Sequence, residues 1–166
     1  MFATKPISPE SVAGALEKAM RYRLLNEPGE AASICRDILE IDPENRQAAI
    51  SLILALTDEI GQEPGAFAEA LSAIAQLPSD YDRAYYAGIA WERRAKARHL
   101  GGGQGARPYV YDWIVTALEL FEEAERLRVA GNDEAVLRWN ACVRFLERNR
   151  QLAPQPEELT EPIASE

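Results

Sequence analysis

One spacing of small and apolar residues occurs twice in this chain, and it limits what the chain can fold into. Positions 31, 35, 38 and 43 hold Ala, Cys, Ile and Pro, and positions 66, 70, 73 and 78 hold Ala, Ala, Ala and Pro at the same intervals. Intervals of four and three place residues on one face of an α-helix, and a proline shortly afterwards ends that helix. Ala117, Phe121 and Ala124 keep the first two intervals a third time. The sequence therefore predicts an array of similar helical units.

Breaks between the helical patterns set the number of elements. A first helix is predicted over residues 9–26, and the Asn, Pro and Gly residues within 26–29 end it. Residues 61–64 and 131–132 contain breaks of the same kind. Counting the periodic segments between such breaks predicts about seven helices between residues 9 and 150.

The third helical hairpin is longer than the others. Trp91 and Ala117 are 26 positions apart, whereas the matching residues of the first unit, Tyr22 and Ala31, are 9 apart, so 17 residues are extra. They comprise the loop sequence GGGQGAR and helical extensions on both sides of it. We expect an extended third hairpin (93–114) that projects beyond its neighbours.

A glycine inside the predicted fifth helix indicates close packing. Glycine in a helix interior costs about 1 kcal/mol relative to alanine, so a compensating reason is expected at Gly88. We expect a neighbouring helix backbone to approach Gly88 too closely for a side chain.

The stretch YRLLNEPGEAASICRDILEIDP, residues 22–43, resembles the middle of a tetratricopeptide repeat (TPR). Tyr22, Ala31, Cys35, Ile38 and Pro43 stand where that family has a large residue, small residues and a closing proline. The resemblance implies an all-α fold, a right-handed superhelix of antiparallel helix pairs, with three repeats and a capping helix in one domain over residues 9–150. Residues 1–8 are expected to be a flexible N-terminus. Residues 151–166, which contain PQPEELTEPIASE, are expected to be a disordered, acidic, Pro-rich tail.

Composition excludes several classes of partner. The formal net charge of -9 and the pI near 4.8 argue against nucleic acid and anionic membrane, because both require a basic face. No apolar run reaches the ~18 residues of a membrane span, and the start of the chain does not have the pattern of a signal peptide. A cytoplasmic protein is expected, with Cys35 and Cys142 as reduced core residues.

Residues suited to catalysis are not grouped in the sequence. His99 is the sole histidine, and no cysteine has a second cysteine or histidine at the spacing of metal ligands. GGGQGAR lacks the lysine and hydroxyl residue of a phosphate-binding loop. We expect no catalytic residue, no metal and no cofactor; an enzyme or small-ligand binder that uses the hairpin tip is the least favoured alternative.

The resemblance implies a binding groove lined by the first helix of each repeat. In the family, the row one residue after the packing stripe faces the groove, and we call it the groove row: Leu16, Met20, Arg23, Ile50, Leu54, Thr57, Tyr85, Ile89 and Glu92. Six of these nine are apolar or aromatic, which predicts a surface that a partner, a second copy or the chain's own C-terminal tail covers. The expected partner is a protein or peptide segment. The alternative is a structural subunit that forms a homodimer through the groove or the long hairpin.

A second candidate surface lies on the extended hairpin. It combines arginines with aromatic residues, the side chains that most often anchor interfaces: Arg93, Arg94, Arg98, Arg107, Tyr109, Tyr111 and Trp113. We predict an accessory arm that binds a protein or a second copy. The simpler interpretation is that these cations complement the dipole at a helix C-terminus.

Overall fold

The computed structural model describes residues 2–102 and 106–154, which form seven α-helices and two short 3-10 helices and contain no strand. The α-helices are α1 (Val12–Leu24), α2 (Pro28–Ile41), α3 (Arg46–Asp58), α4 (Ala66–Ala75), α5 (Asp80–Gly101), α6 (Ala106–Leu127) and α7 (Glu134–Arg148). The 3-10 helices are η1 (Pro9–Ser11) and η2 (Arg150–Leu152). The predicted all-α class and helix number are therefore confirmed for the described residues.

Local chemistry sets the helix ends. The Asn45 side chain accepts a hydrogen bond from the backbone N–H of Ala48 at 3.0 Å, and Ser79 Oγ accepts one from the N–H of Asp82 at 3.2 Å, so these residues cap α3 and α5. The first helix is shorter than the predicted range 9–26. Its beginning is the 3-10 turn η1, and Asn26 has a left-handed backbone (φ 60°) that ends the helical pattern.

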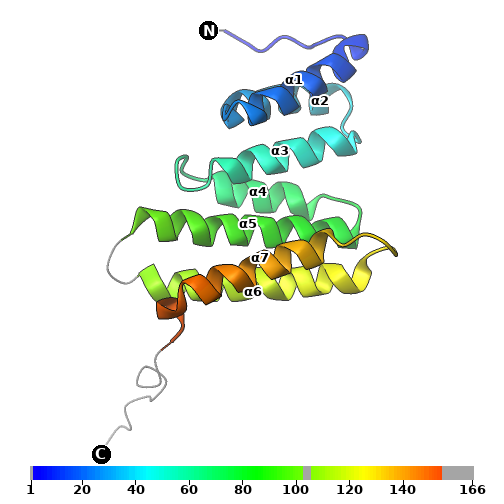
Figure 1. Cartoon of the computed structure of the whole chain (residues 1–166). Helices are drawn as coiled ribbons and strands as arrows, with labels where there is room; N and C mark the ends of the chain where they lie inside the picture. The colour runs from blue at the N-terminus through cyan, green and yellow to red at the C-terminus, as the bar shows by residue number, and fades with distance from the viewer. Residues whose placement is uncertain (1, 103–105, 155–166) are drawn as a thin grey trace, which may run out of the picture.

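The helices stack as antiparallel pairs along one direction (Figure 1). Each helix packs on the next in the chain, and the odd-numbered helices also contact one another, α1 with α3, α3 with α5 and α5 with α7. This alternation lets each pair bury its apolar face against the following pair. The right-handed superhelical course stays a prediction.

The third hairpin has the longest helices. α5 and α6 each comprise 22 residues, whereas α1 to α4 comprise 10 to 14. Figure 1 shows this pair reaching further to one side than the helices above it. Part of the predicted loop, residues 103–105, lies outside the described residues.

The close contact at Gly88 is present, but the expected neighbour is wrong. A Cβ built on Gly88 would lie 2.6 Å from Cε1 and 2.8 Å from Cδ1 of Phe121. The close neighbour is thus the ring of a fully buried side chain on α6 rather than a helix backbone. Periodicity shows which face of a helix is buried, but not which atoms of the next helix fill the space.

The predicted tail begins too early. Gln151 and Leu152 belong to η2, and the Leu152 side chain is buried in the same cluster as Val110 and Phe145. Burial of one leucine contributes roughly 1.5 to 3 kcal/mol, which is enough to fix this last turn on α6. Residues 155–166, the rest of the predicted tail, lie outside the described residues. At the other end, Ile7 of the predicted flexible N-terminus packs against the cluster of Leu16, Ile38 and Ala48.

Candidate functional site

The groove row lies on α1, α3 and α5, but little of it is open to solvent. Met20 is exposed (54%), and Arg23, Ile50 and Leu54 are half-buried. The remaining members are buried: Leu16, Thr57, Tyr85, Ile89 and Glu92. The row is thus less open than its composition indicates.

Helix α7 accounts for much of this burial. Tyr85 and Ile89 belong to the same apolar cluster as Ala135, Cys142 and Phe145, which come from α7. The seventh helix therefore covers the part of the row that α5 contributes. The exposed apolar part is confined to α1 and α3, at Met20 and the edges of Ile50 and Leu54.

A first charged network joins three odd-numbered helices through Asp58. Arg23 of α1 donates to Asp58 of α3, with Nη2 and Oδ2 2.7 Å apart. Arg93 of α5 pairs with the other carboxylate oxygen of Asp58 and donates to the carbonyl oxygen of Leu54 at 3.1 Å. Burial lowers the pKa of Arg93, and Asp58 partly offsets that effect. Asp58 therefore holds two guanidinium groups from two helices in place.

A second charged network joins α5 to α7 through Glu92. This carboxylate is 1% exposed and pairs with Lys96 one turn later in α5. Its other oxygen lies 3.3 Å from Nη1 of Arg138 on α7. Burial, the largest effect, lowers the pKa of Arg138, but Glu92, Tyr85 and Cys142 together outweigh it, so the pKa is raised. An unpaired carboxylate at this depth would cost several kcal/mol, so Lys96 and Arg138 are what allow Glu92 to be buried.

The two networks are neighbours and together carry positive charge. The electrostatic environment of Arg93 includes both Arg138 and Glu92 of the second network. The four cations Arg23, Arg93, Lys96 and Arg138 surround two carboxylates, a formal charge of +2 in a chain whose net charge is -9. We call the surface formed by these six charged residues with Met20, Ile50 and Leu54 the odd-helix face.

Sequence reasoning missed Asp58, Lys96 and Arg138 as members of this face. A signal was present for Arg138, because it interrupts the apolar stripe of the seventh helix. Asp58 directly follows Thr57 of the groove row. Its partners Arg23 and Arg93 lie 35 residues before and 35 residues after it, and nothing in the sequence indicates these pairings.

The residues of the predicted accessory hairpin do not form one cluster. Arg93 donates a hydrogen bond to a carbonyl oxygen of α3. Tyr111 packs against the apolar cluster formed by α5, α6 and α7. Arg98, Arg107 and Tyr109 are exposed, and Tyr109 is 58% accessible. Arg94 and Trp113 do come together, with Arg94 Cζ 4.2 Å from the Trp113 ring centroid. The hairpin thus presents an arginine and aromatic pair on one side and contributes Arg93 to the odd-helix face on another.

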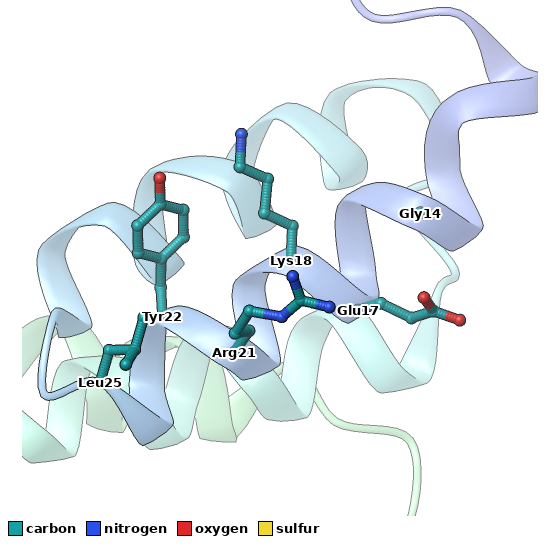
Figure 2. Close-up of a pocket in the computed structure, with 6 residues that line it drawn as sticks. All are labelled: Gly14, Glu17, Lys18, Arg21, Tyr22 and Leu25. Carbon is teal, nitrogen blue, oxygen red and sulfur yellow. The ribbon is translucent and has the colours of Figure 1, made fainter.

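Helix α1 has an uncovered side at the end of the stack. Figure 2 shows six residues around a pocket of about 330 Å³ on this side, Gly14, Glu17, Lys18, Arg21, Tyr22 and Leu25. They recur at helical spacing, and Lys18 Nζ lies 5.8 Å from the centroid of the Tyr22 ring. The stripe is not evident from the sequence, because only Tyr22 and Leu25 in it are large and apolar.

The single histidine contacts an aromatic ring, and the two cysteines lie in apolar clusters. The His99 ring stacks edge-on against Phe145, with centroids 5.3 Å apart. Burial raises the pKa of Cys35 to about 11 and that of Cys142 to about 12, so both thiols stay protonated at neutral pH and react slowly. In the described ranges, no group of three or more His, Cys, Asp or Glu side chains is placed to hold a metal ion.

None of the described helices combines the length and the hydropathy that a membrane span requires. Comparisons of the chain with protein-family models, with curated proteins and with solved structures found no match.

Proposed function

We propose that the chain is a non-catalytic interaction module of the TPR type, which holds a peptide or helix of a partner protein on its odd-helix face. The observation that carries the proposal is the concentration of four cations around Asp58 and Glu92, one of which, Arg23, lies about one turn of α1 from the exposed Met20. Exposed apolar surface next to positioned charges is typical of a protein-binding surface.

The charged networks support binding because they hold the cations before a partner arrives. Asp58 anchors Arg23 and Arg93, and Glu92 anchors Lys96 and Arg138. Side chains that are already positioned lose less conformational entropy on binding. The partner that fits has an apolar side chain for Met20, Ile50 and Leu54, and a carboxylate for the excess positive charge. The net charge of -9 supports a protein rather than a nucleic acid partner, and a cytoplasmic location is part of the proposal.

The experiment compares two matched apolar-to-acidic variants in pull-downs from native cell extract. Met20→Asp changes the odd-helix face, and Val129→Asp changes an exposed apolar residue between α6 and α7. Neither residue is buried, so both variants are expected to fold. We expect Met20→Asp to lose captured proteins that wild type and Val129→Asp retain. Identical captured sets for all three proteins would refute binding at this face.

Self-association is the second candidate, and the uncovered side of α1 favours it. Tyr22 and the exposed Leu25 line the pocket in Figure 2 at the end of the stack, where a second copy can continue the helix packing. Light scattering at several concentrations tests this candidate. A dimer in wild type and a monomer in Leu25→Asp would support self-association through α1, whereas a monomeric wild type would exclude it.

A further inference from the structure

Three successive residues of α5 face three different neighbours. Glu92 pairs with Arg138 of α7, and Arg93 pairs with Asp58 of α3. Arg94 lies on the side of α5 opposite Glu92, since positions two apart on a helix differ by about 200°. There it meets aromatic rings from α4 and α6, and this side of α5 is separate from the odd-helix face.

Arg94 lies over an aromatic surface made of Phe67, Trp91, Tyr109 and Trp113. Its Cζ atom is 4.2 Å from the ring centroids of Phe67 and Trp113 and 5.3 Å from that of Trp91. The rings also contact one another, Phe67 with Trp91 at 4.9 Å and Trp113 with Tyr109 at 6.0 Å. Stacking on rings from three helices holds the guanidinium in place and covers its faces, but ring faces do not accept its in-plane N–H groups.

Arg94 is also the half-buried arginine that lacks a carboxylate partner among the described residues. The other half-buried arginines, Arg23, Arg83, Arg93, Arg128 and Arg138, each pair with Asp or Glu. Burial lowers the pKa of Arg94, and no carboxylate in the described part of the chain contributes to its electrostatics. A partly desolvated cation with five N–H donors, none of which has an acceptor within residues 2–102 and 106–154, is a site that an anion would complete.

We propose that Arg94, held on the aromatic surface of Phe67, Trp91 and Trp113, binds the carboxylate of an acidic segment of a partner protein. The two oxygens of a carboxylate match the paired N–H groups of one guanidinium. A phosphate dianion fits less well, because its three terminal oxygens need several donors and Arg94 supplies a single guanidinium. Arg98, one helical turn further on and exposed, adds a second cation, and the exposed Tyr109 adds apolar contact area. This site does not depend on the odd-helix face.

The test uses acetyl-tetraglutamate amide as the probe and acetyl-tetraglutamine amide as its neutral counterpart, at constant ionic strength. NMR follows the side-chain Nε–Hε signal of Arg94, and the fluorescence of Trp91 and Trp113 gives the Kd. We expect a saturable shift of the Arg94 signal with tetraglutamate. Arg94→Gln should weaken binding about tenfold or more, the usual range for a charge-assisted hydrogen bond. Arg126→Gln, which removes an exposed arginine from α6, is the matched control and should bind like wild type.

Each other outcome overturns part or all of the proposal. An equal Kd for wild type and Arg94→Gln, or an Arg94 signal that does not respond to tetraglutamate, would refute the site. Wild-type affinity in Arg94→Lys would refute recognition by the guanidinium fork. Binding of inorganic phosphate as tight as that of tetraglutamate would refute the carboxylate class. Thermal melting checks that the variants fold. If Arg94→Gln does not fold, the response of the Arg94 Nε–Hε signal of wild type to tetraglutamate alone decides whether the site exists.

Discussion

Replacement of Gly88 by alanine tests the packing of the long hairpin most directly. The added Cβ would lie 2.6, 2.8 and 3.0 Å from Cε1, Cδ1 and Cζ of Phe121. Real Cβ atoms do not approach carbon atoms this closely, so the ring or a helix must move. The Phe121 side chain is 0% exposed and packs among other buried residues, which leaves the ring no free space.

Two effects of opposite sign decide how much Gly88→Ala changes the free energy of unfolding. Overpacking a core typically costs about 1 to 3 kcal/mol. Alanine in place of glycine inside a helix contributes roughly 0.5 to 1 kcal/mol in the other direction. The expected net result for Gly88→Ala is a loss of roughly 0 to 2.5 kcal/mol in the free energy of unfolding. In a chain of this size each kcal/mol corresponds to a Tm change of about 2 to 4 °C.

Gly14→Ala is the matched control. Gly14 lies in α1, and a Cβ added to it would meet nothing within 4 Å. This variant gains the helix propensity of alanine without overpacking, so it should be slightly more stable than wild type. Urea unfolding of wild type and both variants, followed by circular dichroism, gives the two free-energy differences. Their difference isolates the contact between Gly88 and Phe121.

Equal stability of Gly88→Ala and Gly14→Ala would show that the Phe121 ring does not crowd position 88. A double variant adds a second check, because Phe121→Leu removes part of the ring that the new Cβ would meet. We expect Gly88→Ala to cost less in the Phe121→Leu background than in wild type. Equal costs in both backgrounds would show that the strain arises elsewhere.

Three further predictions follow from buried groups. Asp82 is buried and accepts two hydrogen bonds from Arg46, so Asp82→Asn should lower the free energy of unfolding by about 1.5 to 3 kcal/mol. The control is Asp80→Asn at an exposed position, which should change this free energy by less than about 1 kcal/mol. Urea unfolding measures both variants. Leu152→Ala should cost about 2 to 5 kcal/mol in the same assay, since the side chain is buried; no effect would mean that η2 is not docked. The pKa of Cys142 is raised by burial from 9.0 to about 12, so unfolding releases a proton between these values and stability should fall as pH rises from about 9 to 12. Cys142→Ala should show a smaller fall over this range, and unfolding curves at several pH values would show whether it does.

The helices and their buried faces can be predicted from local sequence patterns. The intervals from Ala31 to Ile38 and from Ala66 to Ala73 correspond to α2 and α4, and Ala31, Cys35, Ile38, Ala66 and Ala70 are buried there. Helical periodicity, breaks at glycine and proline, and caps such as Asn45 depend on residues within a few positions of one another, so they can be read locally. The unusual length of the third hairpin follows from the same local signals.

The neighbour that each buried face contacts depends on how the helices pack in three dimensions. Arg93 and Arg94 are adjacent in sequence, yet one pairs with Asp58 of α3 and the other stacks on rings of α4 and α6. Likewise, the family resemblance implied that Tyr85 faces an open groove, whereas α7 covers it, and the same helix supplies Arg138 to the buried Glu92. Periodicity specifies the direction of a side chain around its own helix. The partner depends on how helices that are distant in sequence cross and pack, which no local pattern encodes.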